Sequence, residues 1–414
     1  FAYFSEVIQR VGGGIALYLY NFPQQSAVPF SLALIERLLK AYPGTIRGVK
    51  DSSGDHANMK AMIDAFARDG FEVYSGSDEY LQRILAEGGA GSERITFLSD
   101  YGVHARQSEA ESLAAYGPVY TRYRFVHHDC DDAAAFVDLG RTGRGTPARV
   151  RRELVEAGLV FTVGAISHHY FAGFGGGRKL FFPGLGERRA ILANHRLFLD
   201  PATRTLHPHC CAGRLAGNPL AEDLDEIARL LPRPLSVHGL LDSSGALVAC
   251  RIGRGPEAFT RACREHECCF RAPGDRRYRL VVASAGGYPK DINLIQAHKA
   301  IDNAAGFVRD GGTLVLLAEC ADGVGSAGFL PFFDLGGREQ AFDQLVRDYS
   351  GNGGTALALM AKSSRIRIRL LTGLDPEVCR RIGVRPITIA AAEQLLRAEA
   401  ESSAVIANAS LLVR

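Results

Sequence analysis

The sequence predicts an α/β protein built on parallel sheets, and three observations lead to that class. Apolar strand-like runs alternate with helix-like segments along the 414 residues, which is the pattern of βα units around a parallel sheet. Apolar residues make up 47% of the chain and charged residues 22%, as in ordinary globular proteins. The length is enough for two or three domains.

Composition excludes several functional classes. The net charge of +3 gives no strong attraction to nucleic acid or to a membrane, and no apolar run reaches the roughly 18 residues of a membrane span. The nine cysteines are an odd number without a disulfide framework, so we expect reduced thiols and a cytoplasmic protein. His207 to Cys211 and His266 to Cys269 contain zinc-type ligands, but they lack C-x-x-C spacing, and plain thiols are the alternative.

Residues 1–92 alternate strand and helix. The chain begins in mid-pattern at Phe1, so we expect a fragment or a trimmed product. The predicted strands are 15–20, 45–50 and 71–75, and the predicted helices are 31–41, 56–69 and 79–87.

Three motifs in this segment resemble the aldolase family of dihydrodipicolinate synthase and N-acetylneuraminate lyase. They are Tyr20-Asn21-Phe22-Pro23, Gly48-Val49-Lys50-Asp51-Ser52-Ser53-Gly54-Asp55 and Ser75-Gly76-Ser77-Asp78. The resemblance implies the later half of a (β/α)8 barrel. It assigns Lys50 to a Schiff base with a 2-oxo acid and Tyr20 to proton transfer. The residues alone also fit a surface lysine that follows a strand.

Two further α/β domains are predicted, at 93–270 and 277–414, separated by the charged stretch 271–277, which contains Pro273-Gly274. We expect the last one to be Rossmann-like, although no complete G-x-G-x-x-G is present. The predicted strands are 95–99, 121–127, 159–166, 280–285, 313–318, 355–360 and 366–371. The predicted helices are 108–115, 147–157, 185–193, 220–231, 256–265, 291–309, 337–349 and 391–400.

The stretch after the strand 159–166 is the strongest candidate for a cofactor site. His168 and His169 come first, then the glycines 175–177, then Lys179. Glycines permit close approach of the backbone to a bound group, and such sites form at the carboxyl ends of strands. Arg178 stands where a Walker loop or a dinucleotide fingerprint requires glycine. An ordinary glycine-rich turn is the alternative interpretation.

Lysine is scarce in this chain, because most of its 48 basic residues are arginine. A lysine in such a background indicates a task that guanidinium cannot perform, such as nucleophilic attack by an amine. Lys50 and Lys179 both follow strand-like runs.

Residues 95–414 resemble the lactate racemase family, whose enzymes use a nickel-pincer nucleotide. The ordered motifs are Gly102-Val103-His104-Ala105-Arg106, the stretch from His169 to Pro183, Ala193-Asn194-His195, Gly217-Asn218-Pro219-Leu220, Gly286-Gly287-Tyr288-Pro289-Lys290-Asp291, Gln296-Ala297-His298-Lys299 and Glu319-Cys320-Ala321-Asp322-Gly323. The upstream Asp-x-Thr-Arg segment of that family has no counterpart here.

The resemblance implies a role for each matching residue. Lys179 would be the covalent tether of the cofactor and His195 the protein ligand of nickel, for which neutral imidazole is suitable. His104 and His169 would be the acid/base pair, with His168 as the competitor of His169. Further contacts follow by resemblance: Gly175, Gly176, Gly177 and Arg178 to the cofactor, and Gln296 and Lys299 to the substrate.

The implied reaction is racemisation of a small 2-hydroxy acid, lactate-like, by removal and return of a hydride through the planar 2-oxo acid. Proteins that synthesise the cofactor would then be partners. Two alternatives stay open, a Schiff-base aldolase and a catalytically inactive fusion that only binds a ligand. The sequence does not determine the hydroxy acid or the oligomeric state.

Overall fold

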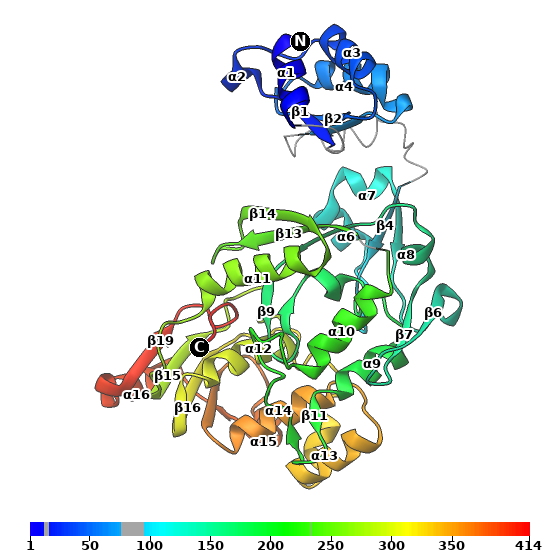
Figure 1. Ribbon diagram of the computed structural model, residues 1–414. Coiled ribbons are helices and arrows are strands. Elements are labelled where there is room, and N and C mark those ends of the chain that lie inside the picture. Colours follow the sequence, from blue (N-terminus) through cyan, green and yellow to red (C-terminus); the bar gives the residue numbers. More distant parts are fainter. Residues whose placement is uncertain (12–15, 76–94, 233) are drawn as a thin grey trace. The chain divides into compact units, whose positions relative to one another are not determined.

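The computed structural model describes residues 1–11, 16–75, 95–232 and 234–414. These divide into two compact units, residues 1–98 with 107–126, and residues 99–106 with 127–414 (Figure 1). The predicted helix 79–87, most of the motif 75–78 and the boundary at 92–93 lie outside the described residues. No helix in the described ranges is long and apolar enough to cross a membrane.

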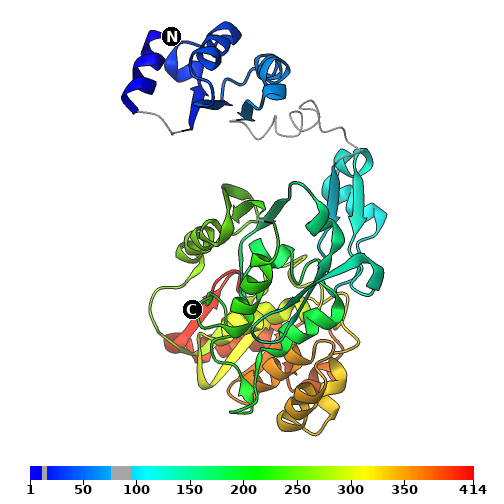
Figure 2. The same cartoon turned by 45° about the vertical axis from the view of Figure 1, so that its right-hand side comes forward.

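Residues 1–11 and 16–75 form a small parallel sheet with helices beside it (Figure 2). The strands β1 (Leu17–Asn21), β2 (Ile46–Asp51) and β3 (Glu72–Ser75) pair in that order. The helices are α1 (Ala2–Val11), α2 (Pro23–Ser26), α3 (Leu32–Ala41) and α4 (His56–Phe66). Fully buried Leu38, Val49 and Met62 join α3, β2 and α4 in one core, so the predicted alternation of strand and helix is confirmed here.

The rest of this unit is a two-stranded sheet of β4 (Thr96–Ser99) and β5 (Arg124–His127) with α6 (Glu109–Tyr116) and α7 (Pro118–Arg122). A capping box begins α6: Ser108 Oγ accepts from the Glu111 amide at 3.2 Å, and Glu111 accepts from the Ser108 amide at 2.7 Å. That prediction is confirmed. The predicted strand 121–127 is wrong at its start, because Pro118 begins α7, which extends to Arg122.

The second unit opens with a hairpin-like pair and a mixed sheet. β6 (Phe136–Arg141) pairs antiparallel with β7 (Pro147–Arg151), which leads into α8 (Arg152–Glu156). β8 (Phe161–Ala165) runs parallel to β13 (Leu235–Leu241), and β14 (Leu247–Arg254) pairs antiparallel with β13. The helices are α9 (Arg188–Arg196), α10 (Pro219–Arg229) and α11 (Gly255–Phe270), and β11 (Leu199–Asp200) pairs with β12 (Thr205–Leu206).

A five-stranded sheet completes this unit, with all pairs parallel and the order β18-β17-β16-β15-β19. The strands are β15 (Tyr278–Ser284), β16 (Val308–Leu317), β17 (Arg367–Leu371), β18 (Arg385–Pro386) and β19 (Ser403–Ile406). The helices are α12 (Leu294–Ala305), α13 (Arg338–Arg347), α14 (Gly353–Ser363), α15 (Pro376–Arg381) and α16 (Ile389–Ala398).

The two faces of this sheet are covered unequally. Val281 of β15 packs in the core shared with α12 to α15, whereas its neighbour Val282 packs against α16. Successive strand residues point to opposite faces, so α16 packs on the face opposite to the one that faces α12 to α15. The carboxyl end of β15 then leads directly to α12, which carries Gln296 and Lys299.

Two predicted elements are of the wrong type. Residues 147–151 are strand rather than helix, because Ala148 and Val150 are buried with period 2 against β6. Residues 355–360, predicted as a strand, lie inside α14, whose first seven residues are all buried. The remaining predicted strands and helices among the described residues are present within five residues of their predicted bounds.

Candidate active site

The predicted cofactor stretch is a tight double turn after β8. β9 (Ser167–His169) pairs antiparallel with β10 (Gly173–Gly175), and the 3₁₀ turn Gly177–Leu180 follows. Gly176 and Gly177 have φ of 74° and 56°, a region that favours glycine. A side chain at Gly176 would lie 2.4 Å from the Ala165 carbonyl oxygen, and one at Gly177 2.3 Å from the Phe259 ring. Packing against β8 and α11 therefore already requires these glycines.

Arg178 is buried within the protein. Its Nε lies 2.6 Å from Asp225 Oδ1 of α10, and its guanidinium stacks at 4.8 Å over Phe259 of α11. These contacts hold the turn to two helices. Nη1 and Nη2 of Arg178 are buried without a hydrogen-bond partner among the described residues, and its predicted contact with a cofactor phosphate stays a prediction.

The turn that carries His104 is tied to the chain beyond Lys179. The Gly102 amide donates to the Gly184 carbonyl at 2.8 Å, and the Gly184 amide donates to the Lys179 carbonyl at 2.9 Å. The His104 amide closes its own turn on the Tyr101 carbonyl at 3.0 Å. Segments some 75 residues apart are thereby brought together, and His104 becomes a neighbour of Lys179.

The ring of Phe171 lies among three predicted site residues. Its centroid is 4.4 Å from that of His169 and 5.1 Å from that of His195, and Lys179 Nζ lies 5.7 Å from it. Phe171 is itself buried. One apolar ring thus fixes the spacing of two imidazoles and an amine.

The two adjacent histidines face different neighbours. His168 packs on His266 at 4.8 Å and on Phe174, while His169 lies beside Lys179 and His195. Adjacent strand residues point to opposite faces, which explains the separation. This geometry supports His169 over His168 as the site residue.

All three site histidines are neutral at pH 7. Burial, and next the charge of Lys179, lowers the pKa of His195 to about 3. Burial and Lys179 also hold the pKa of His169 well below its usual value. Desolvation, followed by Lys299 and Lys179, lowers the pKa of His104. Neutral imidazole is the form that binds a metal or accepts a proton.

His169 has a defined tautomer in this structure. Its Nδ1 accepts from the Ala172 amide at 3.2 Å and more weakly from the Phe171 amide at 3.5 Å. An acceptor nitrogen carries no hydrogen, so the neutral ring must carry it on Nε2.

The two site lysines have weakened basicity. Burial, then the charges of Lys299 and Arg178, lowers the pKa of Lys179 to about 7. Lys299 is exposed by surface area, but desolvation of its amine, then Lys290, lowers its pKa to about 8. A substantial fraction of the Lys179 amine is therefore uncharged and nucleophilic at neutral pH.

The five-stranded part of the unit supplies the other side of the cluster. Lys299 Nζ donates to Gln296 Oε1 at 2.8 Å, because the two residues lie three apart on one face of α12. Tyr170, next to Phe171, bonds through its hydroxyl to Thr355 Oγ1 of α14 at 2.8 Å. The cluster therefore draws on α12 and on the cofactor stretch together.

Asp100 is a neighbour of Lys179 that the sequence analysis missed. It follows β4, and burial raises its pKa to about 6, opposed by its own backbone hydrogen bond and by Lys179. The only signal in the sequence was its place at the carboxyl end of a predicted strand, where α/β sites form.

The predicted aldolase pair lies in the other unit. Tyr20 and Lys50 are register partners on β1 and β2, with Lys50 Nζ 4.5 Å from the Tyr20 ring centroid. A hydrogen bond with Ser52, and then Lys50, lowers the pKa of Tyr20. Lys50 is exposed, unlike Lys179.

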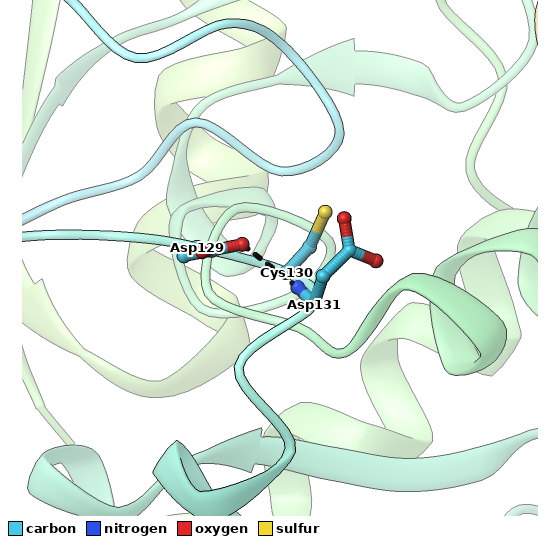
Figure 3. A group of neighbouring side chains, drawn as sticks. All are labelled: Asp129, Cys130 and Asp131. Carbon is cyan, nitrogen blue, oxygen red and sulfur yellow. Dashed lines mark hydrogen bonds between the residues drawn. The ribbon is translucent and has the colours of Figure 1, made fainter.

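A group of potential metal ligands outside the cluster is already engaged. Asp129, Cys130 and Asp131 bring their ligand atoms within 4.8 Å of one another (Figure 3). The Asp131 carboxylate, however, pairs with Arg188 through contacts of 2.6 and 2.7 Å. Burial raises the pKa of the Cys130 thiol, which disfavours the thiolate that metals bind. The group is better explained as an anchor of α9.

Three family models match the chain. Residues 74–206 match the lactate racemase N-terminal domain, residues 275–355 the lactate racemase C-terminal domain, and residues 1–103 the dihydrodipicolinate synthetase family. The matches at the amino-terminal end overlap between residues 74 and 103.

Curated relatives divide in the same way. The lactate racemase of Thermoanaerobacterium thermosaccharolyticum is 31% identical over 248 residues, 58% of this chain and 56% of the relative. That of Lactiplantibacillus plantarum is 28% identical over 243 residues, 58% of this chain and 55% of the relative. An uncharacterized DapA-like lyase of Chloroflexus aurantiacus is 36% identical over 98 residues, 24% of this chain and 31% of the relative. The chain spans about half the length of the two racemases it matches.

A solved structure supports the same division. The lactate racemase apoprotein from Thermoanaerobacterium thermosaccharolyticum superposes with a TM-score of 0.73 at 25% identity, over 81% of this chain and 82% of that chain. A Thermotoga maritima protein with a TM-score of 0.57 at 15% identity, over 93% of this chain and 98% of that one, shares the fold. Residues 74–206 and 275–355 are therefore similar to the N-terminal and C-terminal domains of lactate racemase, and residues 1–103 are similar to the dihydrodipicolinate synthetase family.

Proposed function

We propose that this chain is a racemase of a small 2-hydroxy acid that carries a nickel-pincer nucleotide on Lys179. The observation that supports it most is the convergence of His169, His195 and Lys179 around Phe171, with His104 and Lys299 as neighbours of Lys179. The residues fit such a group. His195 Nδ1 is buried without a hydrogen-bond partner among the described residues, and Lys179 offers a partly uncharged amine.

The protein residues have separable tasks. Lys179 would attach the cofactor and His195 would hold its nickel. When bound, the cofactor accepts and returns the hydrogen on the substrate Cα as hydride. Lys299, held by Gln296, would pair with the substrate carboxylate, and its charge would hold the planar 2-oxo acid in place between the two transfers.

His104 and His169 would move the hydroxyl proton on opposite faces of the substrate. His104 can act as it stands, since its ring is neutral. His169 must change its tautomer before it can act as a base through Nε2. To take a proton on Nε2, its ring must first release the Ala172 amide, because Nδ1 then has to carry the hydrogen.

The amino-terminal segment supports a second, narrower proposal. We infer that residues 1–92 are part of a (β/α)8 barrel, followed by domains at 93–270 and 277–414, the last Rossmann-like. Three parallel strands with intervening helices support the first point, and the five-stranded parallel sheet supports the last. Lys50 and Tyr20, which lie against each other, are the residues that correspond to the aldolase site in this segment.

The decisive experiment separates the tether from mere charge. The chain is produced together with cofactor-synthesis proteins and its intact mass is measured after denaturation. Parent and Lys299→Arg should carry added cofactor mass, and Lys179→Arg none, because guanidinium is no nucleophile at neutral pH. Covalent mass on Lys179→Arg, or none on the parent, would overturn the proposal.

A further inference from the structure

A separate cavity of about 710 Å³ lies in the second unit. It forms where the loop 211–216, the chain after α11, the end of α12 and residues 413–414 meet. Its charged lining consists of Arg214, Arg271, Arg277, Asp302 and Arg414. None of the histidines and lysines grouped around Phe171 lines it, so it is distinct from the candidate active site.

The charges in this cavity do not balance. Arg271 is paired with Glu267 at 2.6 Å, and Asp302 is paired with Lys362. Arg214 donates to the Ala216 carbonyl at 3.3 Å. Arg414 donates to the Asp275 carbonyl, also at 3.3 Å.

Within the described ranges, no carboxylate forms an ion pair with Arg214, Arg277 or Arg414. The carboxylates of Glu267 and Asp302 are already engaged, and Asp275 is the other acidic residue in contact, so the three guanidinium groups on this concave surface outnumber the acidic side chains beside them. Guanidinium groups gathered in this way attract an anion from solution.

Local packing holds this surface together. Gly213 has φ of 78°, and a Cβ there would lie 2.5 Å from Arg271 Nη2. The absence of a side chain lets Arg271 lie against the loop that carries Arg214. Arg271 also donates to the Arg414 carbonyl. Leu215 and Val413 add apolar lining.

We propose that this cavity binds a small organic molecule bearing at least two phosphate charges. The planar guanidinium forks match phosphate oxygens in bidentate geometry. The volume lies in the range of small-molecule sites, about 300–1,000 Å³. A mono-anion such as a 2-hydroxy acid would leave two of the three arginines without a counter-charge. The proposal does not depend on the racemase function.

Calorimetric titration of the full chain with ADP and with pyrophosphate tests the charge requirement, and adenosine is the uncharged control. We expect the two phosphate probes to bind with one site per chain and adenosine not to bind. Arg214→Gln/Arg277→Gln should weaken both probes at least about tenfold, because two charge-assisted contacts are lost. Arg309→Gln, an exposed arginine outside the cavity, should bind as the parent does.

A chemical readout locates the bound probe. Cys211 lines the cavity and is exposed, and Cys268 is exposed without lining it. ADP should slow alkylation of Cys211 in the parent, but not in the double variant, and leave Cys268 unchanged. Lys179→Gln should keep ADP binding, which separates this site from the proposed cofactor site. Failure of both probes to bind, binding unchanged in the double variant, or binding lost in Lys179→Gln would overturn the inference.

Discussion

Lys179 combines a cation with a partly buried position, and desolvation there lowers its pKa to about 7. Burial disfavours the charged form, and the neighbouring Lys299 and Arg178 add repulsion. Below this pH the amine is mostly protonated and cannot attack an electrophile. Above it the amine is mostly free. The reactivity that a covalent tether requires is thus present near neutrality.

This reasoning gives a pH dependence. Acylation of Lys179 by an amine-reactive ester should rise with pH and reach half its maximum rate near pH 7. A short peptide with one lysine, whose amine titrates near 10.4, is the comparison. Peptide mapping by mass spectrometry follows the modified lysine. A midpoint near that of the peptide would contradict the buried, low-pKa amine.

His195 should determine how firmly the metal is held. In chain produced with cofactor-synthesis proteins, His195→Ala should retain at least about tenfold less nickel, since losing even an outer partner of a metal site costs about 10–100-fold in affinity. His207→Ala removes a histidine outside the cluster and should retain nickel as the parent does. Metal analysis per chain measures both, and equal nickel in the two variants would argue against the ligand assignment.

At the scale of elements, the patterns predicted most of the described helices but missed many strands, among them β6, β13 and β14. One failure has a clear cause in complete burial. α14 is buried along its first seven residues, so Thr355 to Met360 shows no polar face, and its apolar run resembles a buried strand. Its alanines favour helix, and contacts with α12 and α13 settle the choice.

The candidate site was predictable to a different extent. Motifs placed His169, Lys179 and His195 in the sequence, but only the fold shows that they share Phe171 as a neighbour. The ion pair of Arg178 with Asp225 joins residues 47 positions apart, and no local pattern indicates it. Asp100 had no motif at all. Local motifs could therefore be predicted from the sequence, whereas contacts between residues far apart in the chain could not.

The turn between β10 and α9 gives a test at this scale. Gly177→Ala should destabilise the protein by about 2–5 kcal/mol, because positive φ costs a residue with Cβ about 1–2 kcal/mol and overlap with Phe259 adds about 1–3 kcal/mol. Gly145 has φ of 87°, and a Cβ added there would have no atom within 4 Å. Gly145→Ala should therefore show only the cost of the positive φ. Urea unfolding of both variants checks this, and equal losses would show that the overlap relaxes.

At the scale of the whole molecule, the chain joins segments that are similar to two enzyme families, and their lysines differ in environment. Schiff-base chemistry needs a desolvated or otherwise activated amine. Lys50 is exposed on a sheet that has three strands among the described residues.

We therefore expect no aldolase turnover from this chain. Pyruvate followed by borohydride should leave the intact mass of the parent unchanged, and pyruvate with an aldehyde acceptor should give no product. Lys50→Ala is the matched control. A pyruvate adduct or product that disappears in this variant would refute the expectation.

Because three site residues share the ring of Phe171, we expect the effects of substituting them to depend on one another. Free-energy changes at residues in contact do not add, so changes at His169, Lys179 and His195 depend on one another through their common neighbour. Loss of this one ring would disturb metal retention, amine reactivity and imidazole titration together while every polar group stayed in the sequence. A genetic screen for inactive variants would then register an apolar position as strongly as any catalytic one. Suppressors of a defect at one polar group would be expected to map to the same ring.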